Sequence, residues 1–177
     1  MTELANIEAL MMRRGSRGRS FETYCSDSAV AATGWPHDVL EQWLFDHWDN
    51  AGFKGDYGTI NPRDVVWRLE IVTAEELSEM PTGDADAGCI EEFAKDPDHW
   101  SGNRGPDVSR CWETDGTWLR PPVLIDRRLL NPPGSGLQVV EGRTRVGVLR
   151  GRLLHGKFVA PEHQAWVGRP SGVPALY

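Results

Sequence analysis

The chain has 177 residues, of which 40% are hydrophobic and 25% charged, and this composition is typical of an ordinary folded domain. No apolar run approaches the roughly 18 residues that span a bilayer, and the first residues lack the order of a signal peptide, so we expect a cytoplasmic protein without a membrane partner. The net charge of −7 argues against general nucleic-acid binding, because such proteins neutralise phosphates with a basic surface.

The first part of the chain is predicted to be irregular. Residues 1–34 are rich in Ser, Arg and Gly and show little hydrophobic periodicity, which indicates a flexible N-terminal arm. The remainder, 35–177, is expected to form a single domain. It begins with a predicted helix over 36–50, with Pro36 at the first helical position and Gly52 at its end.

A strand and a short helix are predicted next. Residues 65–72 alternate in polarity, which is typical of a half-buried strand. The segment Thr73–Glu76 then has the spacing of a capping box, so a helix is expected to begin there. Pro81 is expected to end it.

Residues 82–117 are rich in Asp, Gly and Pro, and they predict a long acidic insertion that crosses the surface. Only one helical turn, over 89–94, is expected within it. Asp84, Asp86 and Glu91 do not have the spacing of a calcium loop, so we interpret them as a solvated acidic face.

Regular structure is predicted again from Pro121. The pattern gives a strand over 122–126, a turn at 131–134, a second strand over 137–141, a helix over 144–154 and a last strand over 164–168. Because helices and strands are mixed, the fold class is α+β, with a small mixed sheet and helices.

The charge is unevenly distributed. From Asp38 to Asp115 there are 19 acidic residues and 6 basic ones, whereas Arg120 to Lys157 contains 8 basic residues and two acidic ones. The basic segment either holds a small anion or pairs with the acidic half. The cysteines are odd in number and lack CxxC spacing, so free thiols are expected rather than disulfides or a structural metal site.

The junction between the predicted strand and helix, "EGRTR" at 141–145, carries the most specific chemistry. A glycine lets the chain turn sharply and lets a ligand approach the backbone. The first N–H groups of a helix lack internal partners and lie at the positive end of its dipole, which suits phosphate. Arg143 and Arg145 can add charge-assisted contacts, and Thr144 a hydroxyl. A basic surface turn without a ligand is the alternative.

The segment from Trp118, "WLRPPVLIDRRLLNPPGSGLQVVEGRTRVGVLRGRL", with the later "HQAWVG", resembles the ParB/sulfiredoxin superfamily. The shared pattern is a proline-led strand, a turn, a strand that ends in an acidic residue and glycine, and a basic motif that opens a helix. The resemblance covers about 50 residues well and about 110 loosely, with the acidic insertion between them. "EGRTR" is most similar to the form found in free-serine kinases.

The resemblance implies a nucleotide-binding domain, because the superfamily holds CTP, ATP or ADP at this motif. By position, the phosphate-binding residues would be Gly142, Arg143, Thr144 and Arg145. Mg²⁺ is expected to accompany the nucleotide, and the implied activity is phosphoryl transfer to a small or protein acceptor, or nucleotide hydrolysis.

The candidate catalytic carboxylates are Glu141, Glu70 and Glu76. Glu141 adjoins the arginines, where it either contacts metal or acceptor or forms a structural ion pair. The other two lie near the opening strand and helix, where superfamily kinases place a glutamate. For Glu76 a purely structural role in the capping box is the favoured alternative.

The sequence also departs from the superfamily. No cysteine lies between Glu141 and Arg145, so sulfiredoxin activity is not expected, and no helix-turn-helix region is predicted after the last strand, so DNA segregation is not expected. Two rival functions remain. A non-catalytic protein-interaction domain that retains the fold predicts motif arginines held in internal ion pairs, whereas an enzyme predicts a carboxylate facing them across an open cleft. A ParB-like nuclease predicts a long basic groove.

Overall fold

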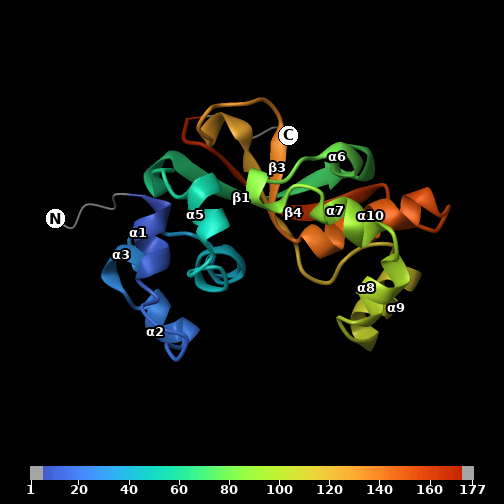
Figure 1. Cartoon of the computed structure of the whole chain (residues 1–177), viewed down its shortest axis with the longest axis horizontal. Coiled ribbons are helices and arrows are strands. Elements are labelled where there is room, and N and C mark those ends of the chain that lie inside the picture. Colours follow the sequence, from blue (N-terminus) through green and yellow to red (C-terminus); the bar gives the residue numbers. More distant parts are fainter. Residues whose placement is uncertain (1–5, 173–177) are drawn as a thin grey trace. The chain divides into compact units, whose positions relative to one another are not determined.

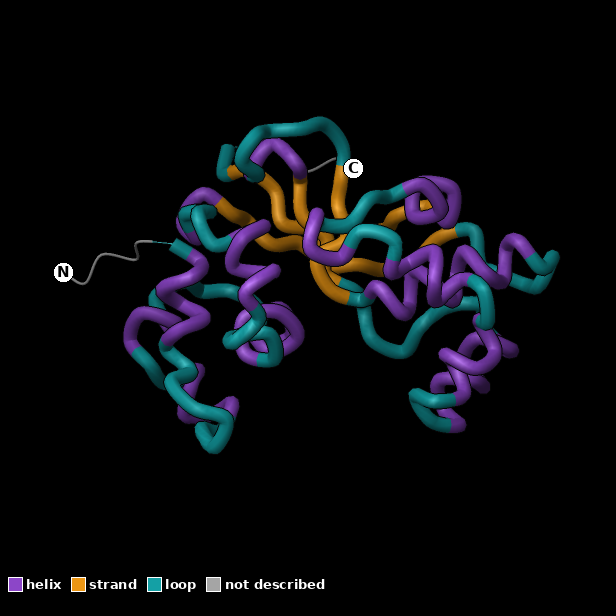
Figure 2. The backbone as a smooth tube through the Cα atoms, in the orientation of Figure 1, coloured by secondary structure: helices purple, strands orange, loops and turns teal. Residues whose placement is uncertain are grey.

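The fold is a mixed α+β arrangement, as the sequence predicts. A computed structural model describes residues 6–172, and its four strands form one mixed sheet in the order β1-β4-β2-β3, drawn in orange in Figure 2. The strands are β1 (Val65–Thr73), β2 (Val123–Asp126), β3 (Leu137–Glu141) and β4 (Glu162–Pro170). All four predicted strands are confirmed, and β4 extends beyond its prediction at both ends.

The chain divides into two compact units. The first contains the residues up to Arg68, the segment Ile125–Leu137 and the residues from Val167 onward. The second contains Leu69–Leu124 and Gln138–Trp166. Residue 34, the predicted border between an arm and a single domain, therefore lies within the first unit.

The predicted flexible arm is corrected by the structure, because most of its described residues belong to three short helices of the first unit. These are α1 (Ile7–Met12), α2 (Phe21–Cys25) and α3 (Ser28–Ala31), shown in blue in Figure 1. Asn6, Ser20 and Asp27 each cap one helix through the side chain. The buried residues of these helices are Ile7, Leu10, Met11, Tyr24, Ala29 and Val30. Residues 1–5 of the arm lie outside the described part.

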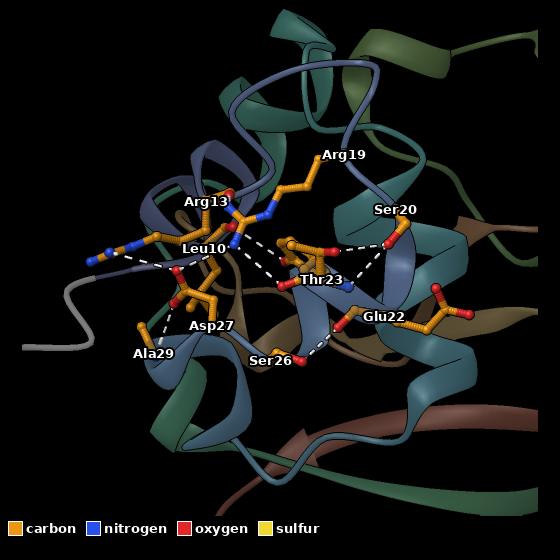
Figure 3. A network of polar contacts seen from close by, with 10 residues as sticks. Leu10, Arg13, Arg19, Ser20, Glu22, Thr23, Ser26, Asp27 and Ala29 are labelled. Carbon is orange, nitrogen blue, oxygen red and sulfur yellow. Dashed lines mark hydrogen bonds and ion pairs between the residues drawn. The ribbon is translucent and has the colours of Figure 1, made fainter.

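Polar contacts hold these helices to one another, as Figure 3 shows. The Asp27 carboxylate accepts from the Ala29 N–H at 3.0 Å and lies 3.9 Å from the guanidinium of Arg13. Arg19 donates to the backbone carbonyl oxygens of Arg13 and Thr23. A segment that buries side chains and makes these contacts is part of the fold, and a search for hydrophobic periodicity misses it because each helix is only four to six residues long.

The predicted helix 36–50 is confirmed only in part. The structure has α4 (His37–Val39), which continues into a π-helical stretch, η1 (Leu40–Phe45), and then a separate helix α5 (Ala51–Tyr57). Gly52 does not end a helix but lies in the first turn of α5, because the Asn50 side chain caps a new helix at Phe53 N–H.

An aromatic cluster forms the core of the first unit. The ring of Trp43 stacks on Trp35 with centroids 5.8 Å apart and meets Tyr57 and Trp67 edge to face. Trp67 from β1 also covers Gly168 of β4, where an added Cβ would lie 2.8 Å from the indole ring. The first unit then includes η2 (Pro62–Asp64) before β1 and η4 (Arg127–Leu129) after β2.

In the second unit, the prediction that the acidic insertion 82–117 crosses the surface with only one helical turn is wrong. After α6 (Ala74–Glu79), it contains η3 (Asp84–Asp86), α7 (Cys89–Ala94), α8 (Pro97–Gly102) and α9 (Pro106–Thr114). Ile90 and Trp112 are buried, so the segment contributes to the core rather than crossing the surface. Within it, only the helix over 89–94 was predicted.

The segment is anchored by close packing of α7 against α10 (Arg143–Leu154), which lie side by side in Figure 1. Two glycines of α10 make this approach possible. An added Cβ at Gly147 would lie 2.4 Å from Phe93 Cβ, and one at Gly151 would lie 2.4 Å from the carbonyl oxygen of Ala94.

Two further expectations concern the whole chain. All three cysteines are free, as predicted. Among the described residues, no helix combines the length and the apolar character that crossing a bilayer requires.

Candidate functional site

The junction between β3 and α10 has the predicted form. β3 ends at Glu141, Gly142 adopts a left-handed conformation with φ 102°, and α10 begins at Arg143. Glycine is required here for two reasons. A residue with a side chain is strained at this φ, and an added Cβ would lie 2.5 Å from Pro122 Cβ.

The N-terminus of α10 is not capped by a side chain of the described chain. The helix has twelve residues, and its first N–H groups lie at the positive end of the helix dipole. Arg143 and Arg145 add two cations to the first turn, where the dipole makes positive charge unfavourable. Anionic partners are therefore needed at this end of the helix.

Arg143 obtains two such partners. Its guanidinium forms one ion pair with Asp86 of η3 and a second with Glu141 at 3.2 Å, and all three side chains are mostly buried. Burial lowers the pKa of Arg143, but the two carboxylates outweigh this, so the pKa is raised above its ordinary value. Arg143 therefore remains charged and is oriented by the protein itself.

Arg145 connects α10 to the segment that leads into β2. It donates to the carbonyl oxygens of Arg120 at 2.8 Å and Pro121 at 3.3 Å, and it lies 3.7 Å from the Glu141 carboxylate. These contacts hold the proline-led segment beside the Gly142 turn. Glu141 thus forms structural ion pairs, one of the two roles predicted for it.

Thr144 is contacted by a further arginine. Its hydroxyl accepts from the Arg104 guanidinium at 3.2 Å, and Arg104 is exposed and lies between α8 and α9. A third cation from a distant part of the sequence is therefore near the first turn of α10.

Three further cations of the basic segment pair with the acidic segment. Arg150 pairs with Glu91 at 2.9 Å and Arg152 with Glu113 at 2.6 Å. The Lys157 ammonium binds the Asp98 carboxylate. The alternative that the two oppositely charged segments pair is thus confirmed for these residues. The interpretation of Asp84, Asp86 and Glu91 as a solvated face is wrong for Asp86, whose side chain is mostly buried, whereas Asp84 and Glu91 are exposed.

The structure does not bring Glu70 to the Gly142 turn. Glu70 lies on β1 and Glu141 on β3, the two edge strands of the sheet, with β4 and β2 between them. At about 4.8 Å per strand, the two edge strands are roughly 14 Å apart.

Glu76 has the structural role that was the favoured alternative. Its carboxylate accepts from the Thr73 N–H and hydroxyl, both at 2.9 Å, and its own N–H donates to the Thr73 hydroxyl oxygen at 3.1 Å. The capping box at the start of α6 is therefore confirmed.

The surroundings of the site do not offer a metal cage or an activated thiol. Within the described residues, no group of three or more His, Cys, Asp or Glu side chains is arranged to hold a metal ion. Burial raises the pKa of the Cys89 thiol, and nearby Arg143 opposes this shift only in part.

Two residues near the site were missed by the sequence analysis. Asp86 and Arg104 lie 57 and 40 positions before their partners, Arg143 and Thr144. The only available signal was the opposite charge of the two segments, which indicates pairing but not which residues pair.

Comparison with known proteins found no match: no family model matches the chain, and neither a curated protein nor a solved structure is significantly similar to it.

Proposed function

We propose that the N-terminus of α10 binds the phosphates of a nucleotide. The observation that carries the proposal is the uncapped start of a twelve-residue helix directly after a left-handed glycine. Backbone N–H groups in this setting are natural phosphate ligands. The resemblance of "EGRTR" to the ParB/sulfiredoxin motif supports the same ligand class, with ATP, ADP and CTP as the ligands to test.

The side chains of the site have different roles in this proposal. The exposed guanidinium of Arg104 and the hydroxyl of Thr144 supply direct phosphate contacts beside the backbone of Gly142. Arg143 and Arg145 supply positive potential from fixed positions, because carboxylates and carbonyl oxygens already orient them. Mg²⁺ would enter with the phosphates, since it keeps several waters and is usually bound through one or two carboxylates.

Phosphoryl transfer to a small acceptor, or nucleotide hydrolysis, is the activity to assay at this site. Such chemistry depends on positioning and on neutralisation of charge more than on covalent catalysis. Of the three candidate carboxylates, Glu141 adjoins the proposed phosphate site. Because it already pairs with Arg143 and Arg145, we assign it the positioning of these two cations rather than the contact to metal or acceptor.

Thermal-shift titration with ATP, ADP, CTP and GTP, with and without Mg²⁺, tests the proposal. A nucleotide at 100 times its dissociation constant stabilises the fold by about 2.7 kcal/mol, which raises the melting temperature by several degrees. Arg104→Ala should weaken nucleotide binding by roughly tenfold or more, because a charge-assisted contact is lost. Arg110→Ala, which removes an exposed arginine of α9, is the matched control for charge and should bind as the unaltered protein does.

A second candidate function, a non-catalytic protein-interaction domain, is favoured by the ion pairs of the motif. Arg143 and Arg145 contact Glu141 directly instead of facing a carboxylate across a gap. If no nucleotide shifts the melting temperature, the proposed phosphate site is wrong and this second function becomes the leading one.

A further inference from the structure

The edge strand β1 has the features of a surface that pairs with another strand. In the described sheet it is hydrogen-bonded to β4 and occupies the end of the strand order. It is nine residues long, "VVWRLEIVT", and contains neither proline nor lysine, which proteins commonly use to protect an edge.

The hydrogen bonds to β4 determine which backbone groups face the open edge. Asp64 accepts from Ser171 N–H just before β1, and Ala74 N–H donates to Pro161 just after it. Asp64 and Ala74 are ten residues apart, and so are their partners Pro161 and Ser171. The two strands therefore pair between these bonds without a β-bulge. Because bonding alternates along an antiparallel strand, the even-numbered residues of β1 face β4. The N–H and C=O groups of Trp67, Leu69 and Ile71 therefore point to the open edge.

The side chains along this edge are apolar and exposed. Val66, Leu69 and Ile71 have exposed fractions of 37%, 45% and 58%. The sequence pattern places Leu69 and Ile71 on one face of the strand with Val65 and Trp67, and on this face Val65 is buried whereas Leu69 and Ile71 are exposed. A long apolar edge of this kind is stabilised when another strand pairs with it.

The charges of β1 indicate that the partner is a second copy of this chain. In an antiparallel pair with its two-fold axis at Leu69, Arg68 lies opposite Glu70 of the partner subunit, and the same contact occurs twice. Both contacts fall at non-hydrogen-bonded positions, where opposing side chains are closest. Trp67 then lies opposite Ile71 of the partner subunit, an aromatic pair with a β-branched residue.

The neighbouring registers are less favourable. An axis at residue 68 would place Arg68 opposite its own copy, and an axis at residue 70 would do the same for Glu70, so both oppose like charges. We propose that the chain forms a two-fold dimer through antiparallel pairing of β1 with β1 of a second copy, in the register centred on Leu69. The inference does not depend on nucleotide binding.

Sedimentation velocity of the full 177-residue chain over a range of concentrations tests the proposal. The unaltered protein should dimerise, and Arg68→Glu and Glu70→Arg should each raise the dimer dissociation constant by roughly tenfold or more, because each replaces two attractive contacts with two repulsive ones. The double variant, which carries both reversals, restores the opposite charges and should dimerise like the unaltered protein. Circular dichroism of the single and double variants at a concentration where the unaltered protein is monomeric checks that the fold is retained, so that a change in dimerisation is not a change in folding.

Ile71→Lys provides a second, independent test. This side chain is exposed, so the fold should be retained, as checked by circular dichroism, but a lysine should block the approach of a second strand. An unaltered chain that stays monomeric at all concentrations would overturn the proposal and leave the edge for a strand of a different protein. A dimer that is unchanged in Ile71→Lys and in both single reversals would also overturn it.

Discussion

Gly142 allows the chain to turn between β3 and α10. Replacing it should lower the stability of the fold through two contributions, backbone strain and a steric contact. Gly142→Ala imposes left-handed strain and brings a Cβ against Pro122. Gly88→Ala is the matched control, because Gly88 also precedes a helix in a left-handed conformation but an added Cβ meets no atom within 4 Å. We expect Gly88→Ala to cost about 1–2 kcal/mol and Gly142→Ala about 1–3 kcal/mol more, as measured by urea unfolding. Equal losses would show that the contact with Pro122 is unimportant.

Asp126 gives the stability a defined dependence on pH. Burial raises the pKa of its carboxyl, but the hydrogen bonds and charge of Arg128, together with the charge of Arg169, outweigh burial, so the pKa lies below its ordinary value. A lowered pKa stabilises the folded state above the unfolded-state pKa of about 3.9, and this contribution is lost as the pH falls through the folded-state value.

We therefore predict that Asp126→Asn is less stable than the unaltered protein at pH 6–7 and that the difference narrows below about pH 4. Urea unfolding across this pH range measures the effect. Asp107→Asn removes a carboxylate from an exposed ion pair and should alter stability little at any pH. A difference for Asp126→Asn that stays constant down to pH 2 would contradict the assigned role of its carboxylate.

At the scale of elements, α10 and α7 can pack closely because α10 has glycine at the contact. Replacing glycine by alanine in a helix normally stabilises a protein by about 1 kcal/mol. We expect this for Gly55→Ala in α5, where an added Cβ meets no atom within 4 Å. Gly147→Ala should instead be destabilising, because its Cβ would overlap Phe93. Thermal unfolding should thus shift in opposite directions, and stabilisation by both changes would argue against the close packing.

Two substitutions of Glu76, in the capping box of α6, distinguish a structural role of this residue from a catalytic one. Glu76→Gln keeps an acceptor for the Thr73 N–H, whereas Glu76→Ala removes it and should cost about 1 kcal/mol of stability. If nucleotide turnover is found, Glu76→Gln should retain it. Loss of turnover in this variant without loss of stability would return Glu76 to the catalytic candidates.

The elements that were predicted correctly are those whose sequence pattern lies within a few neighbouring residues. The capping box at Thr73, the strand–turn–strand unit 122–141 and the glycine before α10 are each encoded within a few residues. The helices over 7–31 and 97–114 were missed, because they are at most nine residues long and owe their stability to distant contacts. The exposed side of β1 was missed as well, since alternation indicates two faces but not which of them is covered.

At the scale of the whole molecule, the candidate site shows what charge patterns can predict. The segregated charges left two alternatives, binding of a small anion or pairing between the two halves, and Arg143, Arg150, Arg152 and Lys157 form ion pairs with the acidic segment. The individual partners depend on how residues 82–117 fold onto α10, which no local pattern specifies. The motif could therefore be located from the sequence, whereas the residues that surround it could not.

This pairing leads to a prediction about nucleic acid. A nuclease needs a basic surface that extends along several phosphates, but here Arg143, Arg150, Arg152 and Lys157 of the basic segment pair with carboxylates, and the net charge is −7. Fluorescence anisotropy with a labelled DNA duplex at about 50 mM and 200 mM salt should show no saturable binding at micromolar protein concentration. Binding whose affinity falls steeply with salt would contradict the prediction, because that dependence measures the release of counterions from phosphates by free cations. It would then favour the nuclease over both the nucleotide-binding and the protein-interaction functions.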